Sequence, residues 1–183
     1  MAEERIIIAG FGGQGVLMLG KLLAAAGMME GKQVTWLPSY GPEMRGGTAN
    51  CNVIISEEEI GAPIVSEATG LIAMNLPSLD RFESSVLPGG WLLLNSSLIP
   101  RGPVRTDLRC VPVPVNEIAQ RQGSQRVANV VMLGACLALC RPVGKASVVA
   151  AIEEVLGPTK KHLLAINLNA LEAGLAFAPP VPA

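Results

Sequence analysis

The distribution of apolar and polar residues predicts strands that alternate with helices. The first strand is a continuous apolar run, Arg5–Ala9, ended by Gly10, which is typical of a strand covered on both faces. A helix over Gly13–Met29, stopped by Gly31, is apolar around nearly its whole circumference, which indicates a buried helix. Further strands are predicted at 33–37, 48–56, 70–74, 91–94 and 109–113, and further helices at 77–86, 116–122, 127–139, 145–156 and 162–177. This alternation predicts a single three-layer α/β/α domain with a mostly parallel sheet.

Proline and glycine mark the predicted ends of several elements. We expect Pro38 to close the second strand, and Pro88-Gly89-Gly90 to stop the helix over 77–86. No linker or internal repeat interrupts the chain, so residues 5–177 form one predicted domain. The Pro-rich tail, 178–183, cannot continue the last helix, and we expect it to be disordered or to lie as a short arm on a partner.

Composition adds an expectation about the surface. Charged residues make up 16% of the 183 residues, against roughly 25% in a typical soluble domain. The shortfall predicts that a partner or a second copy covers part of the surface, so the isolated chain is a candidate dimer. A net charge of -1 and few aromatic residues give no support to a nucleic-acid role.

The sequence also predicts a cytoplasmic protein without a membrane span. The N-terminus is polar and acidic rather than a basic segment followed by a long apolar stretch. The apolar run Val127–Cys140 is shorter than the ~20 residues that a span needs.

The cysteines are better explained as buried thiols than as metal ligands. Cys136 and Cys140 stand one helical turn apart, but no second pair and no His lies near them in the sequence, and Cys51 and Cys110 are isolated. Free Cys is among the most buried residue types, and no C-x2-C-x2-C spacing is present. We therefore expect no metal site on this chain.

A glycine-rich segment follows the first predicted strand. Gly10-Phe11-Gly12-Gly13-Gln14-Gly15 fits G-x-G-x-x-G between a strand and a helix, where backbone N–H groups and the helix dipole attract anions. The acid that should bind a ribose is missing, because Trp36-Leu37-Pro38-Ser39 occupies its position. Three interpretations stay open: NAD(P) binding, tight packing alone, or contact with another phosphate or carboxylate such as CoA. The candidate binding residues are Gly10, Gly12, Gly13, Gln14 and Gly15.

A second unusual segment joins two predicted strands. In Tyr40-Gly41-Pro42-Glu43-Met44-Arg45-Gly46-Gly47, Arg45 could offer its guanidinium to a phosphate or carboxylate. Tyr, Met and Arg are also enriched in interfaces. An internal Glu43–Arg45 contact, a subunit contact and a ligand contact stay open as roles. The candidate contact residues are Tyr40, Glu43, Met44, Arg45, Gly46 and Gly47, and this loop and the glycine loop are expected at the carboxyl ends of strands.

Three stretches together resemble a known family. Ile-Ala-Gly-Phe-Gly-Gly-Gln-Gly-Val at 8–16 and Ser-Tyr-Gly-Pro-Glu-Met-Arg-Gly-Gly-Thr-Ala-Asn-Cys-Asn-Val at 39–53 look like the γ subunit of 2-oxoacid:ferredoxin oxidoreductases. Asn-Val-Val-Met-Leu-Gly-Ala at 129–135 resembles a later helix motif of that family. The resemblance runs from about residue 5 to 175, and the second motif is its most specific part. It implies a Rossmann-like fold of the pyruvate:ferredoxin oxidoreductase γ-domain type.

The resemblance implies a noncatalytic but required subunit of a complex. That complex converts a 2-oxoacid, CoA and oxidised ferredoxin into acyl-CoA, CO2 and reduced ferredoxin. Thiamine diphosphate, Mg and iron–sulfur clusters are expected on the α, β and, where present, ferredoxin-like δ subunits, so this chain alone would bind no cofactor. The γ domain is expected to pack against α and β near the region where CoA enters. 2-Oxoglutarate is the favoured substrate, with branched-chain 2-oxoacids next and pyruvate and indolepyruvate behind.

No catalytic residues can be assigned from the sequence. No nucleophile–base pair or carboxylate pair stands out, and His162, beside Lys160 and Lys161, is expected in solvent. The isolated chain is therefore predicted to be inactive. Two alternatives are an independent dinucleotide-binding oxidoreductase that uses the Gly10–Gly15 loop, and a stand-alone regulatory module that uses the Arg45 loop.

Overall fold

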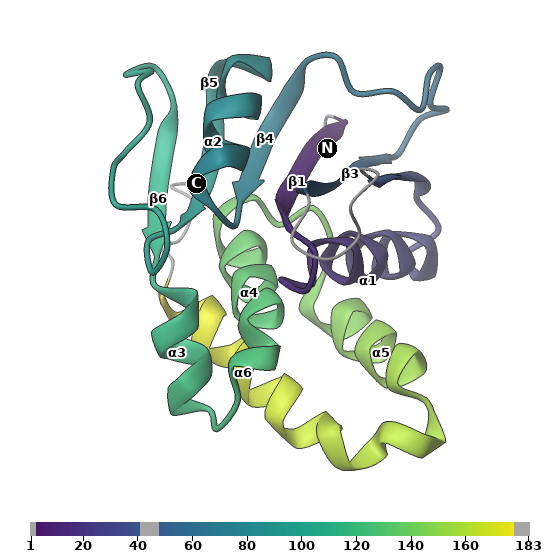
Figure 1. Cartoon of the computed structure of the whole chain (residues 1–183). Helices are drawn as coiled ribbons and strands as arrows, with labels where there is room; N and C mark the ends of the chain where they lie inside the picture. The colour runs from purple at the N-terminus through teal and green to yellow at the C-terminus, as the bar shows by residue number, and fades with distance from the viewer. Residues whose placement is uncertain (1–2, 41–47, 178–183) are drawn as a thin grey trace.

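A computed structural model describes residues 3–40 and 48–177, which form one six-stranded sheet with helices on both faces (Figure 1). The strands are β1 (Glu4–Phe11), β2 (Gln33–Tyr40), β3 (Thr48–Ser56), β4 (Ala68–Ala73), β5 (Val86–Asn95) and β6 (Arg109–Val113), in the spatial order β2-β3-β1-β4-β5-β6. Only β3 runs against the others, antiparallel to both β1 and β2, while β1, β4, β5 and β6 pair in parallel. The predicted mostly parallel α/β sheet is confirmed.

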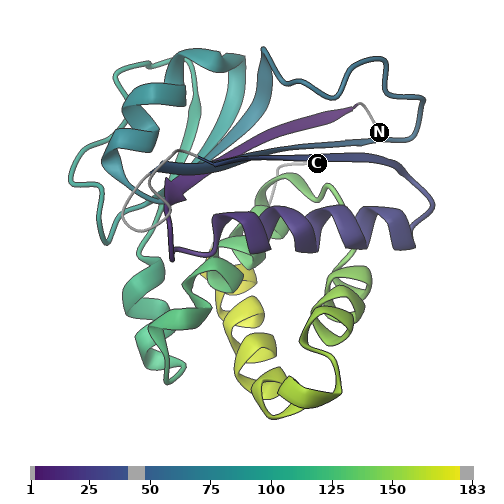
Figure 2. The ribbon, with the colours of Figure 1, turned by 45° about the vertical axis from the view of Figure 1, so that its right-hand side comes forward.

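The helices form two unequal outer layers. They are α1 (Val16–Met29), α2 (Leu76–Phe82), α3 (Val115–Arg121), α4 (Ala128–Cys140), α5 (Lys145–Leu156) and α6 (Leu164–Phe177), with 3-10 turns at Glu83–Ser85, Gln125–Val127 and Pro158–Leu163. One face of the sheet carries α2, and the other carries α1 and α4 with α5 and α6 beyond them (Figures 1 and 2). The predicted three layers are present, with most of the helical mass on one side.

β1 lies in the interior of the sheet, as its apolar run predicts. Ile6, Ile7, Ile8 and Ala9 are at most 2% exposed. Because side chains alternate along a strand, Ile6 and Ile8 pack in the core under α1 and α4, whereas Ile7 joins the smaller core under α2. A strand in the interior of a sheet that helices cover on both faces needs apolar residues on both faces.

Two predicted breaks at proline are wrong. β2 continues through Pro38, which pairs with Cys51 of β3, and ends at Tyr40. β2 is an edge strand of the described sheet, so it can place the missing N–H of Pro38 on its unpaired side.

The second wrong break is Pro88-Gly89-Gly90. The preceding helix already ends at Phe82, and β5 begins at Val86 and runs through these three residues. Ala68 pairs with Val86 but Gly70 pairs with Trp91, so the extra residues of β5 form an irregularity in the ladder. Gly89 has φ 77°, a conformation that glycine adopts without strain. The segment is therefore a strand irregularity rather than a helix stop.

α1 differs from its prediction at its start and in its burial. The helix begins at Val16 because Gly13 and Gly15 have positive φ, 96° and 75°, which a right-handed helix cannot contain. Its outward side exposes Met18 by 41% and Met28 by 69%. The expectation of a helix buried all round is therefore wrong, and part of its apolar surface faces outward.

The four cysteines are free thiols: Cys51 and Cys136 are buried, Cys110 and Cys140 half-buried. Within the part of the chain that the structure describes, no three His, Cys, Asp or Glu residues are grouped so that they could hold a metal ion. No described helix is long and apolar enough to cross a membrane. The tail 178–183 lies outside the described residues.

We predict that Cys51 resists alkylation in the folded chain. Burial raises the pKa of its thiol from 9.0 to about 12. Above pH 9.0 an unfolded chain would release this proton while the folded chain keeps it, so the contribution of Cys51 to stability is lost as the pH rises towards about 12. Iodoacetamide at about pH 8.5 should label Cys51 only after denaturation, as mass spectrometry of the peptides can measure. Rapid labelling of Cys51 in the native chain would contradict its burial.

Candidate functional site

The carboxyl ends of β1, β4, β5 and β6 meet at one edge of the sheet because these strands run in the same direction. Phe11 pairs with Thr48, and Tyr40 pairs with Ala49, so the end of β2 and the start of β3 lie at this edge too. We call it the strand-end edge. In open α/β sheets, ligands bind at such an edge.

The predicted site residues fall differently on this edge. Gly10, Gly12, Gly13, Gln14 and Gly15 extend from the end of β1 to the start of α1. Glu43, Met44, Arg45, Gly46 and Gly47 lie outside the described residues, as does the side chain of Tyr40. The structure thus places the glycine loop and the backbone of Tyr40.

Two glycines of the loop are needed for close packing. A Cβ on Gly10 would lie 2.7 Å from Gln14 Oε1 and 2.9 Å from Met74 Cβ. Gly15 combines a positive φ with a neighbour in α4, since its Cβ would lie 2.7 Å from Asn129 Nδ2. Gly13 also has a positive φ, but open space surrounds it. Packing thus explains Gly10 and Gly15, whereas Gly13 needs glycine only for its backbone conformation.

The Gln14 side chain stabilises the conformation of the glycine loop. Its Oε1 accepts hydrogen bonds from the Phe11 N–H at 2.6 Å and from Asn75 Nδ2 at 3.1 Å. Its Nε2 donates to the carbonyl of Met74 at 3.1 Å. Gln14 therefore ties the end of β1 to the end of β4.

A row of asparagines continues this network across the edge, and it was not predicted from the sequence. Asn75 accepts the N–H of Ser78 at 2.9 Å and so caps α2. Asn95, fully buried, donates to the Met74 carbonyl at 3.3 Å and to Asn116 Oδ1 at 3.1 Å. Asn129 donates to the Gly15 carbonyl at 3.4 Å. Asn75, Asn95 and Asn116 each follow an apolar strand segment in the sequence. That position is the sequence signal from which these three could be found.

A cavity beside the glycine loop, just before the start of α1, suits an anion. Gly15, at the N-cap position, supplies no side-chain cap, and the first turn of α1 has no acidic residue. The cavity has a volume of about 260 Å³ and is lined by Gly13, Gln14, Met74, Asn116, Gln125, Arg126 and Ala128. A helix N-terminus carries partial positive charge, and Arg126 adds a full one. Among the described residues no carboxylate lines this cavity, so the electrostatics of these residues favour phosphate or carboxylate groups.

The strand order argues against a dinucleotide site. In a dinucleotide-binding fold the second strand lies beside the first, so that an acid at its end reaches the ribose. Here β3 lies between β1 and β2, and the end of β2 (Leu37-Pro38-Ser39) carries no acid. The glycine loop therefore lacks the neighbouring strand that completes such a site.

Comparison with known proteins gives consistent matches. The family model described as pyruvate ferredoxin/flavodoxin oxidoreductase matches residues 5–177. Ketoisovalerate oxidoreductase subunit VorA of Methanothermobacter thermautotrophicus is 44% identical over 179 residues, covering 96% of this chain and 36% of VorA. 2-Oxoglutarate synthase subunit KorC of Methanocaldococcus jannaschii is 33% identical over 170 residues, covering 90% of this chain and 91% of KorC. The chain thus spans about a third of the length of VorA but nearly all of KorC.

Solved structures share the fold. The γ subunit of a keto/oxoacid ferredoxin oxidoreductase from Geobacter sulfurreducens superposes with a TM-score of 0.82 at 30% identity, covering 96% of this chain and 98% of that one. A 2-oxoglutarate:ferredoxin oxidoreductase chain from Magnetococcus marinus has a TM-score of 0.88 at 24% identity, covering 97% of this chain and 31% of that one. The similarity to the Magnetococcus marinus chain concerns the fold alone.

Proposed function

This chain belongs to the pyruvate ferredoxin/flavodoxin oxidoreductase family, and from that premise we propose that it is the γ-type subunit of a 2-oxoacid:ferredoxin oxidoreductase complex. The complex oxidatively decarboxylates a 2-oxoacid with CoA and ferredoxin to give acyl-CoA, CO2 and reduced ferredoxin. The observation that carries the proposal is the family match over residues 5–177 together with 33% identity to nearly the whole of KorC. With this role we propose a cytoplasmic location.

The proposed partners are α and β subunits, and a ferredoxin-like δ subunit where one exists. They would hold thiamine diphosphate with Mg and the iron–sulfur clusters. Support comes from the two forms in which relatives occur: KorC is matched over 91% of its length, whereas VorA is matched over only 36%. A domain that is a separate subunit in one relative and part of a longer chain in another is expected to act beside further protein.

The proposed role of the strand-end edge is to receive the anionic part of CoA. The uncapped start of α1 and the cavity beside it favour phosphate groups, since none of the carboxylates within residues 3–40 and 48–177 lines that cavity. Arg45 is proposed to act at the same edge, because its loop leaves β2 at Tyr40 and returns at Thr48. The substrate proposed first is 2-oxoglutarate, with 2-ketoisovalerate next, the two types to which KorC and VorA belong by name.

We predict that Arg45→Ala weakens CoA use or assembly of the complex. A charge-assisted hydrogen bond contributes about 1.5–3 kcal/mol, so its loss should raise the apparent KM for CoA roughly 10- to 100-fold or reduce the recovered subunit ratio. The measurement is the CoA dependence of ferredoxin reduction by the co-expressed complex, with subunit stoichiometry from the same preparation. Arg121→Ala, at an exposed position in the last turn of α3, is the control. Unchanged KM and unchanged assembly would remove Arg45 from the site.

A further inference from the structure

A second hollow lies within the helical layer, among α1, α4, α5 and α6. Its volume is about 360 Å³, and nine of its thirteen lining residues are apolar. They include Leu22 of α1, Val130 of α4, Ile152 and Leu156 of α5, and Ile166 of α6. Pockets of roughly 300–1,000 Å³ with mostly apolar walls and few polar groups are typical of small-molecule sites. The apolar walls of this hollow lie outside the cavity beside the glycine loop, but Arg126 lines both.

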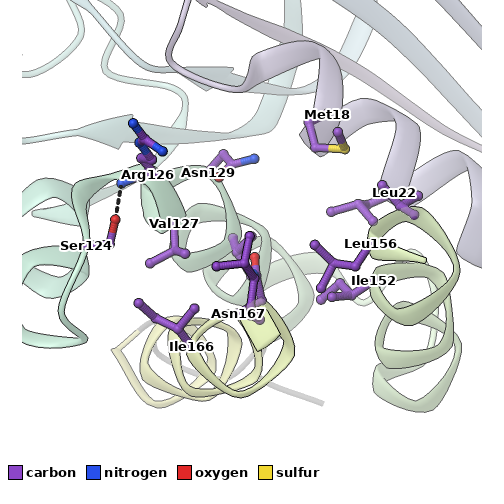
Figure 3. Close-up of a pocket in the computed structure, with 13 residues that line it drawn as sticks. Met18, Leu22, Ser124, Arg126, Val127, Asn129, Ile152, Leu156, Ile166 and Asn167 are labelled. Carbon is purple, nitrogen blue, oxygen red and sulfur yellow. Dashed lines mark hydrogen bonds between the residues drawn. The ribbon is translucent and has the colours of Figure 1, made fainter. Parts of the chain in front are cut away.

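The hollow is polar at one end and apolar at the other. Figure 3 shows Ser124 and Arg126 at one end, and Leu22, Ile152 and Leu156 at the opposite end. The Ser124 hydroxyl accepts the backbone N–H of Arg126 at 3.2 Å. The polar end therefore has a fixed backbone position, and the walls change from polar to apolar along the hollow.

Of the residues that the structure describes, Arg126 is the only charged one that lines the hollow. Its side chain is exposed, and it has no ion-pair or hydrogen-bond partner among residues 3–40 and 48–177. The other polar lining residues, Ser124, Asn129 and Asn167, are neutral. Asn167 Nδ2 is already engaged, since it donates to the Leu163 carbonyl at 2.8 Å. The guanidinium is thus the one lining group with an unmet preference for an anion.

We propose that this hollow binds a medium-chain aliphatic monocarboxylate. The carboxylate pairs with the Arg126 guanidinium, and the hydrocarbon chain lies against Leu22, Ile152 and Leu156. Apolar walls alone would accept any apolar body, but a single unpaired cation at one end selects a ligand with one terminal negative charge. Every residue of the site belongs to this chain, so the isolated chain should bind the ligand. Because Arg126 also lines the cavity beside the glycine loop, a phosphate bound there would compete for the same guanidinium.

The test is calorimetric titration of the full chain with octanoate, with 1-octanol as the uncharged probe of the same length. Octanoate should bind at least about tenfold more tightly than octanol, since a charge-assisted bond is lost with the alcohol. Along hexanoate, octanoate and decanoate, affinity should rise about fourfold for each added methylene. Equal affinity for octanoate and octanol, or no binding of octanoate, overturns the proposal. Absence of octanoate binding overturns the proposal even if it arises because self-association of the chain closes the hollow.

Variants then locate the binding. Arg126→Met should reduce octanoate affinity about tenfold or more and leave octanol affinity unchanged. Leu156→Lys, at a half-buried position at the apolar end, should reduce binding of both ligands. Arg121→Met, which removes an exposed charge outside the hollow, should change neither. Octanoate binding that survives Leu156→Lys places the ligand elsewhere and overturns the proposal, provided circular dichroism shows each variant folded.

Discussion

Gly174→Ala is expected to destabilise the chain strongly, because it forces apart two helices of the core. α4 and α6 touch through their backbones at this point: a Cβ on Gly174 would lie 2.0 Å from the Val131 carbonyl oxygen, and one on Gly134 would lie 2.2 Å from that of Leu171. Backbone cannot rotate aside as a side chain can, so the helices must separate. Overpacking costs about 1–3 kcal/mol and occasionally more, and we expect about 3 kcal/mol net of the better helix propensity of Ala.

The thermal midpoint measures this effect. A loss of about 3 kcal/mol corresponds to a fall of roughly 6–12 °C for a domain of this size. Ala176→Val, which enlarges an exposed side chain on the same helix, should change the midpoint by only a degree or two. If Gly174→Ala melts with the unchanged chain, α4 and α6 are not in backbone contact.

Gly15→Ala is also expected to destabilise the chain strongly, and it acts at the candidate site. An Ala at φ 75° is strained, and its Cβ would also meet Asn129 at 2.7 Å. The left-handed conformation costs about 1–2 kcal/mol for a residue with a Cβ, and the collision adds to this. The expected loss is about 2–4 kcal/mol, measured by urea unfolding, together with weaker CoA use if the loop carries the CoA contact.

Gly13→Ala is the matched comparison for Gly15→Ala. Gly13 has a similar positive φ of 96°, but nothing lies within 4 Å of its Cβ position. Its substitution should therefore cost only the backbone strain of about 1–2 kcal/mol. Equal losses for the two variants would show that the Asn129 contact is unimportant. A Gly15→Ala, Asn129→Ala double variant that loses less than the sum of the single variants would confirm the contact.

Much of the fold could be predicted because the decisive signals are local. The uninterrupted apolar run at 6–9 requires cover on both faces wherever the strand lies, and β1 has it. The helix over Lys145–Leu156 was predicted with the bounds that the structure has, since glycines precede and follow it. The breaks predicted at Pro38 and Pro88 are wrong because the effect of proline on a strand depends on the neighbouring strands. Pro38 is tolerated on an edge strand, and Pro88 is tolerated within an irregular strand.

The candidate site could be predicted only in part for the same reason. The glycine loop was identified from its spacing, but the partners that require Gly10 and Gly15, Met74 and Asn129, come from distant parts of the sequence. Asn75 and Asn95 each end an apolar strand segment, and only the parallel strand order brings them to one edge. The resemblance of residues 39–53 to the γ subunit, by contrast, agrees with the family match. A specific motif can be recognised from the sequence without knowledge of the fold.

Purification of the tagged chain from its native host tests the central claim most directly. The γ-subunit role predicts that the chain elutes as part of a larger complex that contains thiamine diphosphate and iron. That complex should reduce ferredoxin only when a 2-oxoacid and CoA are both present. A chain that elutes by itself, with neither thiamine diphosphate nor 2-oxoacid-dependent ferredoxin reduction in its fractions, would contradict the role.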